Sequence, residues 1–385
     1  MALDLSTLLY TTVTDRPSFL EEITLDVNDR KALLDARTAL RDGLRSCLRR
    51  EVEKLVEDGS KHARPKFVTQ GSFSYKTINK PCRPPQQADL DDGIYLPLSY
   101  VQDKGQPAEA AEALFDAVAS CANEVAKANG WSVETSNPRC TRVIVSGHMH
   151  IDIPLYSIPD DEFERLVEAH AMDSLQKAER TFDQLEEEDW EDVRSDRVLL
   201  ATRDEGWLAK DPRPIRNWVN QVIDTKGEQL RRVMRYVKAW RDHQHWSMGD
   251  DPKSLMLMVA AEHAFEDAVL RRDDLALLSV VRRMADVVNG PLLAPWPGES
   301  EDLTKRLDKY EGLRADVVKR LREFAAALDF AINTARTAAE ACDKLREVLG
   351  PRVPNRPDLV LMASATASPA VAVPSAGSVG RQNNA

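Results

Sequence analysis

The chain has 385 residues, of which 43% are hydrophobic and 30% charged, and its formal net charge is −11. This length allows a sizeable core and two domains or one large bilobal unit. The acidic balance excludes a general nucleic-acid coat protein, which needs a basic surface, although it leaves room for a local basic cleft. The N-terminus shows no signal-peptide pattern, and no window reaches the roughly 18 consecutive apolar residues of a membrane helix. We therefore expect a cytoplasmic protein with no membrane partner.

The predicted elements begin with a long helix over residues 25–58, where Leu40, Leu44 and Leu48 recur at helical spacing. Between residues 67 and 158, short apolar runs alternate with turn residues around a helix at 108–129. This alternation of short apolar runs, turns and a helix predicts a mixed α/β segment. The proline-rich stretch from Pro81 to Gln87 cannot pair as a central strand and is expected to form a loop.

Beyond residue 160 the pattern becomes helical and is expected to stay so. The stretch "QLRRVMRYVKAWRDHQ" places its apolar residues on one face, and "SLMLMVAAEHAFEDAVL" is apolar nearly all round, which predicts a buried helix. One or two more helices are expected over residues 303–349. The last residues, 362–385, are small, polar and without periodicity, so we expect a disordered tail.

The five cysteines are scattered, without a CxxC pair. In a reducing cytosol this distribution predicts free thiols rather than disulfides or a zinc cluster. The cysteines are Cys47, Cys82, Cys121, Cys140 and Cys342.

Two acidic stretches suggest a shared site. In "ADLDDG", Asp89 and Asp91 alternate along a predicted strand and therefore project from one face. In "HMHIDIPL", Asp152 shares a face with His148 and His150, opposite the apolar residues of the same strand. If the two strands are neighbours, three carboxylates converge on one face of a sheet.

Three converging carboxylates without a counter-charge would cost several kcal/mol each. Two Mg²⁺ ions about 3.5–4 Å apart would relieve that repulsion and could support phosphoryl transfer. The preceding Gly71-Ser72 turn offers backbone N–H groups and a hydroxyl that suit phosphates. Each feature is common by itself, because a lone DxD is more often a solvated strand face and a lone Gly-Ser more often a turn. Their order along the chain favours a nucleotide site.

At these residues the sequence resembles the nucleotidyltransferase superfamily that includes DNA polymerase β. More narrowly, it resembles the bacterial cGAS/DncV-like nucleotidyltransferases (CD-NTases) of anti-phage CBASS systems, in their DncV-like subgroup. The matching segments are "QGSFSYKT", "PPQQADLDDGIYLPL", "HIDIPLYSIP", "WLAKDPRPIRNW" and "QLRRVMRYVKAWRDHQ". The proline-rich loop lengthens the spacing from Ser72 to Asp89 beyond the general superfamily pattern, as is familiar in this subgroup.

The resemblance implies an α+β, bilobal, polymerase-β-like fold with a small mixed sheet, a long N-terminal helix and a helical C-terminal lobe. The expected units are a nucleotidyltransferase core at 1–215, a helical lobe at 216–361 and the tail at 362–385. The implied activity joins ATP and GTP into cyclic GMP–AMP, with release of pyrophosphate and no need for nucleic acid. A downstream effector would read this second messenger in anti-phage defence. The alternatives are another cyclic di- or trinucleotide, linear or RNA-end nucleotidyl transfer, and an inactive nucleotide-binding scaffold.

The resemblance also implies roles for individual residues. Asp89 and Asp91 would bind both Mg²⁺ ions, with Mn²⁺ as the alternative ion, and Asp152 would complete the site that activates the acceptor hydroxyl. Gly71 and Ser72 would hold the donor triphosphate. The remaining implied nucleotide contacts are Lys238 and Ser254 at the phosphates, Gln70 and Tyr75 flanking the nucleotide, and Glu301 or Asp302 reading a base.

Several of these residues could instead have a purely structural role. Lys238 could lie on a solvated helix face, Ser254 could cap its helix, and Glu301 could be an ordinary acid at a helix N-terminus. His148 and His150 with Cys140 give only three candidate zinc ligands, which favours positioning or packing roles.

The end of the chain carries its own prediction. In this family the C-terminus of the synthase is often joined to a target by E1/E2-like conjugation enzymes, and a flexible tail ending at Ala385 fits that pattern. The alternative is a disordered end with no function.

Overall fold

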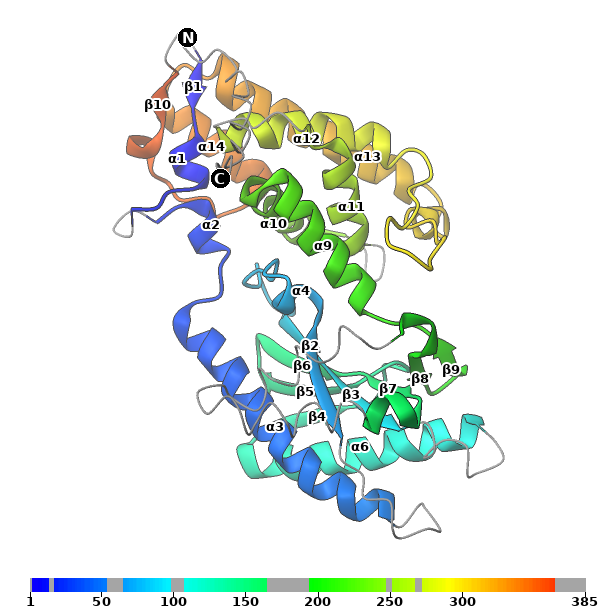
Figure 1. Cartoon of the computed structure of the whole chain (residues 1–385). Coiled ribbons are helices and arrows are strands. Elements are labelled where there is room, and N and C mark those ends of the chain that lie inside the picture. Colours follow the sequence, from blue (N-terminus) through cyan, green and yellow to red (C-terminus); the bar gives the residue numbers. More distant parts are fainter. Residues whose placement is uncertain are drawn as a thin grey trace, which may run out of the picture.

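A computed structural model describes residues 2–13, 17–53, 65–97, 107–164, 194–246, 251–266 and 272–363 of the chain. Figure 1 shows two lobes, one built around a mixed sheet and the other built of helices. This arrangement confirms the predicted α+β class. Among the described residues, no helix combines the length and the hydropathy that a membrane span requires.

The main sheet has eight strands in the order β4-β5-β6-β3-β7-β8-β9, and β2 pairs with β3 off this path. The central strand β3 runs parallel to β6 along its first half and to β7 along its second, and antiparallel to β2. The strands are β2 (Lys66–Gln70), β3 (Ala88–Pro97), β4 (Ser132–Glu134), β5 (Thr141–Ser146), β6 (Met149–Ile153), β7 (Leu155–Ile158), β8 (Leu199–Thr202) and β9 (Gly206–Ala209).

Strands β8 and β9 correct the expectation that the chain is helical throughout after residue 160. Each has only four residues, and they pair with each other and, through β8, with β7. Such short segments carry too few alternations to be distinguished from a helical turn by sequence pattern alone.

Helices α3 (Val27–Glu53) and α6 (Pro107–Asn129) cover one face of this sheet (Figure 1). The core between helices and sheet contains Leu90 and Ile94 of β3 and Ile151 of β6, all with no exposed surface. Because successive strand side chains point to opposite faces, the polar residues that alternate with these three lie on the other face of the sheet.

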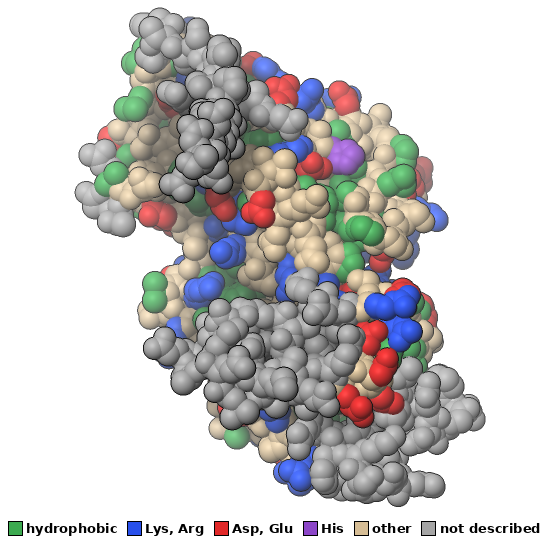
Figure 2. Space-filling view, viewed as in Figure 1, with side chains coloured by type: hydrophobic (Ala, Val, Ile, Leu, Met, Phe, Trp, Pro, Cys, Tyr) green, Lys and Arg blue, Asp and Glu red, His purple; other side chains and the backbone are tan. Residues whose placement is uncertain are grey.

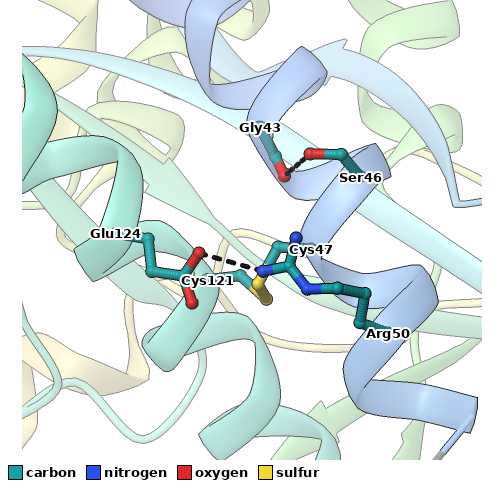
Figure 3. The surroundings of a disulfide bond; sticks show 6 residues. All are labelled: Gly43, Ser46, Cys47, Arg50, Cys121 and Glu124. Carbon is teal, nitrogen blue, oxygen red and sulfur yellow. Dashed lines mark hydrogen bonds and ion pairs between the residues drawn. A yellow bond between two sulfur atoms is a disulfide. The ribbon is translucent and has the colours of Figure 1, made fainter.

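A disulfide links the two covering helices, which corrects the prediction of free thiols for this pair. Cys47 of α3 and Cys121 of α6 are bonded with a Cα–Cα distance of 5.6 Å, and Arg50 pairs with Glu124 beside them at 3.1 Å (Figure 3). The two cysteines are 74 positions apart in the sequence, and their proximity arises from helix packing, so the sequence pattern did not show it. The other three cysteines, Cys82, Cys140 and Cys342, are free as predicted.

The second lobe has a continuous helical core. Helix α11 is buried almost all round, as its sequence pattern predicted. Helix α10 buries the predicted apolar face, and from Tyr236 to Trp240 every residue is buried. Its helices are α9 (Arg213–Lys226), α10 (Glu228–His243), α11 (Ser254–Ala264), α12 (Asp273–Val287), α13 (Leu313–Asp329) and α14 (Ala338–Leu349).

Segments near the beginning and the end of the described chain meet in this helical lobe. Strand β1 (Leu3–Asp4) pairs antiparallel with β10 (Leu361–Met362), and the short helices α1 (Ser6–Leu9) and α2 (Phe19–Glu22) add side chains to the helical core. The lobe boundary near residue 215 stays a prediction. Apart from its first two residues, the predicted tail at 362–385 lies outside the described residues.

Arginine side chains attach the proline-rich loop, and Asn79 just before it, to the helical lobe. Arg83 donates to the carbonyl oxygens of His243 and Gln244 at 2.9 and 2.7 Å, and Arg235 donates to Asn79 Oδ1 at 3.0 Å. The segment from residue 81 to 87 forms no strand, as predicted. These contacts hold the two lobes around a shared opening.

Candidate active site

The acidic cluster is built by the register of two parallel strands. Asp89 and Asp91 of β3 lie directly beside His150 and Asp152 of β6, respectively. All four side chains project from the sheet face that α3 and α6 leave uncovered, because Leu90 and Ile151 between them point into the core. The two strands are therefore neighbours, and the three carboxylates converge as the alternation predicted.

This cluster carries more negative charge than its surroundings neutralise. Burial raises the pKa of Asp91 well above its usual range, and the nearby carboxylates of Asp89 and Asp152 raise it further. A buried carboxyl group in such a place must either take up a proton or face a cation.

One of the three carboxylates has a fixed counter-charge. Arg142, which lies opposite Asp152 on β5, donates from Nε and Nη2 to the two oxygens of Asp152, each at 2.7 Å. This two-bonded pair fixes the Asp152 carboxylate and raises the pKa of Arg142 above its usual value. The sequence did not identify Arg142 as a site residue. The only sequence feature that could have indicated it is a basic residue inside an otherwise apolar strand.

The cluster also has donor atoms that suit a divalent cation. One atom each from Asp89, His150 and Asp152 lies within 4.8 Å of the others. Asp89 Oδ1 and His150 Nε2 are buried and make no hydrogen bond within the described part of the chain. Carboxylate oxygens and an imidazole nitrogen are common metal ligands, so these residues fit an ion. Cys140, the third candidate for zinc, is not part of this group.

Gly71 and Ser72 lie against the acidic cluster. They begin α4 (Gly71–Ser74), a single helical turn directly after β2, where the sequence predicted only a turn. Gly71 has a φ of 63°, and a Cβ at this residue would lie 1.9 Å from Asp91 Oδ2. Only glycine allows the backbone to approach the carboxylate this closely.

An open cavity of about 640 Å³ lies between the lobes and collects most of the predicted site residues. Figure 2 shows Lys and Arg side chains gathered at the level where the two lobes meet. The predicted residues that line the cavity are Gly71, Ser72, Tyr75, Asp89 and Asp91 from the sheet lobe, and Lys238 and Ser254 from the helical lobe. Asp152 lies beside this wall, and its side chain is 9% exposed.

Lys238 reaches the cavity from inside the helical lobe. Its Nζ donates to the carbonyl oxygen of Thr77 at 2.7 Å, and the residue is buried, so the alternative of a solvated helix face is wrong. Burial is the main cause that lowers its pKa to about 7, and Arg241 adds to the effect.

Ser254 takes a different place from the predicted cap. It is the first residue of α11 rather than the cap, and its side-chain oxygen accepts a hydrogen bond from Arg241 Nη1 at 2.6 Å. Its position on the cavity wall nevertheless leaves the predicted contact with a nucleotide available.

Two predicted nucleotide contacts are absent from the cavity wall. Gln70 turns toward β7, where its Nε2 donates to the hydroxyl oxygen of Tyr156 at 2.9 Å. Glu301 is exposed on a loop, and the neighbouring Asp302 accepts hydrogen bonds from the backbone of Leu292 and Thr304. Asp302 therefore shapes its own loop in the structure.

Comparison with known proteins identifies the relatives of this chain. Residues 65–156 match the family model described as the nucleotidyltransferase domain of DncV-like cyclic GMP-AMP synthase, and residues 227–362 match its C-terminal domain. A curated cyclic GMP-AMP synthase of Vibrio cholerae is 30% identical over 343 residues, which cover 82% of this chain and 75% of that protein. One from Escherichia coli is 29% identical over 330 residues, covering 83% and 74%.

Solved structures show the same fold. The Vibrio cholerae DncV cyclic AMP-GMP synthase superposes with a TM-score of 0.75 at 23% identity, over 94% of this chain and all of that one. Escherichia coli DncV in its 3'-deoxy GTP bound form gives a TM-score of 0.72 at 22% identity, over 93% and 99%. Fold and acidic cluster together define a nucleotidyltransferase. The chain belongs to the DncV-like family of nucleotidyltransferases, as its sequence motifs predicted.

Proposed function

We propose that this protein is a cytoplasmic cyclic-dinucleotide synthase that joins ATP and GTP into cyclic GMP–AMP. The observation that carries the proposal is the acidic cluster of Asp89, Asp91 and Asp152 beside Gly71, at the wall of a cavity that Lys238 also lines. The matched relatives are named cyclic GMP-AMP synthases, which supports the same product here.

The triphosphate of the donor nucleotide would lie along Gly71 and Ser72, within reach of Lys238. A triphosphate near Lys238 would favour the charged form of its amine, because opposite charges in a buried place attract strongly. Asp89, Asp91 and Asp152 would hold two Mg²⁺ ions, or Mn²⁺ as the alternative. When bound, such ions make a hydroxyl more nucleophilic and neutralise charge on the leaving oxygen.

The chemistry requires the same exchange of bonds twice. A ribose hydroxyl oxygen bonds to the α-phosphorus of the other nucleotide, while the bond from that phosphorus to the bridging oxygen of pyrophosphate breaks. The hydroxyl proton leaves toward the carboxylate cluster, where Asp152 is held in place by Arg142. The first exchange gives a linear dinucleotide that still carries a triphosphate. After this intermediate turns over in the cavity, the second exchange closes the ring and releases a second pyrophosphate.

The test is a synthesis assay with the full chain, labelled ATP and GTP, and Mg²⁺. We expect a nuclease-resistant cyclic product from the native protein and its loss in the Asp89→Asn/Asp91→Asn variant. Asp35→Asn is the matched control, because Asp35 is an exposed acid on α3 that pairs with Lys31. Retained synthesis in the double variant would overturn the proposal. A linear product, extension of added RNA, or no turnover by the native protein would favour the respective alternative.

We also propose that the product acts on a downstream effector in anti-phage defence and that E1/E2-like enzymes conjugate the C-terminus at Ala385. The tail beyond residue 363 lies outside the described residues, so family membership supports this step. Mass spectrometry after co-expression with the neighbouring operon enzymes tests it. Absence of any C-terminal adduct would refute it.

A further inference from the structure

His150 has one ring nitrogen whose hydrogen bond is fixed by its neighbours. Its Nδ1 lies 2.9 Å from Gln87 Oε1, and the amide nitrogen of Gln87 donates to the carbonyl oxygen of Ser146 at 3.4 Å. That second bond orients the amide so that its oxygen faces the ring. An amide oxygen can only accept, so Nδ1 carries a hydrogen atom, and Nε2 is the nitrogen with a lone pair in the neutral ring.

The lone-pair nitrogen faces the acidic cluster. Nε2 lies 3.0 Å from Asp89 Oδ1 and 3.7 Å from Asp152 Oδ1, and His150 is only 5% exposed. Neither Nε2 nor Asp89 Oδ1 makes a hydrogen bond to any residue that the structure describes, although the two atoms are close. Two buried acceptors facing each other are unfavourable unless a cation or a proton lies between them.

The spacing of these atoms fits a shared metal ion. Adjacent ligands in an octahedral shell with bonds of about 2.1 Å lie about 3 Å apart, and opposite ligands lie about 4.2 Å apart. The distances from His150 Nε2 to Asp89 Oδ1 and to Asp152 Oδ1, 3.0 and 3.7 Å, lie in this range, and the three residues form one group of candidate ligands. Each carboxylate oxygen has two lone pairs, so Asp152 can bind an ion and Arg142 at the same time.

We propose that His150 Nε2 is a direct ligand of one of the two metal ions, together with Asp89 and Asp152. The inference rests on the proposed function, in which these carboxylates hold two ions. The two metal positions then differ in chemistry. One has an imidazole ligand and accepts first-row transition ions, including Mn²⁺, more readily than Mg²⁺, while the other has oxygen ligands only and suits Mg²⁺.

Pulsed electron paramagnetic resonance with bound Mn²⁺ tests this ligand directly. Full-length protein with less than one equivalent of Mn²⁺ is expected to show electron spin-echo modulation from an imidazole ¹⁴N nucleus. The modulation should change to a ¹⁵N pattern when the native protein is made with ¹⁵N-histidine, a measurement that needs no variant. Absence of nitrogen coupling in the native protein would overturn the proposal, because Nε2 would then hold a proton toward Asp89.

Two variants assign the nitrogen to one residue. His150→Gln should remove the modulation and weaken Mn²⁺ binding about tenfold or more, with a smaller effect on Mg²⁺. His148→Gln is the matched control, since His148 lies two residues earlier and its Nε2 pairs with Asp29 at 2.9 Å. Modulation that persists in His150→Gln would refute the assignment.

The synthesis assay separates this inference from the proposed function. Cyclic product without nitrogen coupling would reject the His150 ligand and leave the function standing. Nitrogen coupling without any nucleotide product would support the His150 ligand and reject the proposed function.

Discussion

The backbone of Gly71 lies so close to Asp91 that a Cβ on Gly71 would be 1.9 Å from Asp91 Oδ2. Gly71 also has a φ of 63°, which is unfavourable for any residue with a side chain. The strand β3 and the helical turn α4 thus meet at a point where only glycine fits. Through this contact, a residue that bears no functional group controls the position of the Asp91 carboxylate, which we propose as a metal ligand.

Gly71→Ala should therefore impair synthesis sharply. We expect a fall in kcat of about 100-fold, because a displacement of about 1 Å at reacting groups can have that effect. The left-handed backbone should also cost about 1–2 kcal/mol of folding free energy. Steady-state kinetics and urea unfolding measure the two effects. Gly147→Ala is the control, because a Cβ on Gly147 would meet no atom within 4 Å apart from its chain neighbours. Unchanged kcat in Gly71→Ala would contradict this interpretation of the contact.

Asp92, the third acid of the "DLDD" stretch, has a structural role that differs from that of its neighbours. Its carboxylate points to the helix side of the sheet and accepts from Arg41 Nε and Nη2 at 2.7 and 2.6 Å, with both residues buried. Asp92→Asn should lower the free energy of unfolding by about 3–5 kcal/mol, because it leaves a buried guanidinium without its partner charge. Chemical denaturation measures this loss.

The matched control for Asp92 is an exposed ion pair on the same helix as Arg41. Asp35→Asn breaks the pair with Lys31, in which Asp35 is 64% and Lys31 72% exposed, and should change stability by less than about 1 kcal/mol. An equal decrease in the free energy of unfolding in the two variants would show that the buried Arg41–Asp92 pair stabilises the protein no more than the exposed pair.

Lys238 should make nucleotide binding depend on pH. In the free protein its pKa is lowered to about 7 from an ordinary 10.5, so at pH 8 the amine is mostly neutral. A triphosphate beside it favours the charged form, so binding at pH 8 should take up a proton. The uptake should decrease as pH falls below 7, where the amine is already charged before binding. Isothermal titration calorimetry in buffers with different ionisation enthalpies measures the number of protons.

A variant isolates the contribution of this lysine from that of the nucleotide phosphates. Lys238→Met should bind more weakly and lack the extra proton uptake that the native protein shows at pH 8. The same uptake in both proteins would exclude Lys238 as its source.

The disulfide between α3 and α6 predicts a thiol count and a stability change. Without reductant, the unfolded protein should show three free thiols, and all five cysteines should react after reduction. Cys121→Ala should lower the free energy of unfolding by about 2–4 kcal/mol, since the bond closes a long loop in the unfolded chain. Cys82→Ala, at a free cysteine, is the control. Five reactive thiols before reduction would show that the bond does not form.

The sequence by itself determined the local features of this protein. Period-two alternation placed Asp89 with Asp91 and Asp152 with His150, and helical periodicity predicted α3, α6, α10 and α11. The motif order was specific enough to indicate the family, and the two family matches confirm it. Such patterns are short-range, so they can be read from neighbours along the chain.

Only the tertiary structure decided which distant residues meet. The strand register places Arg142 opposite Asp152 and His150 beside Asp89. Helix packing brings Cys47 close enough to Cys121 to form a disulfide. Docking of the lobes buried Lys238 against Thr77 and left Glu301 on an exposed loop, where sequence alone allowed either site for each. These outcomes depend on packing between segments far apart in the chain, and no local periodicity encodes them.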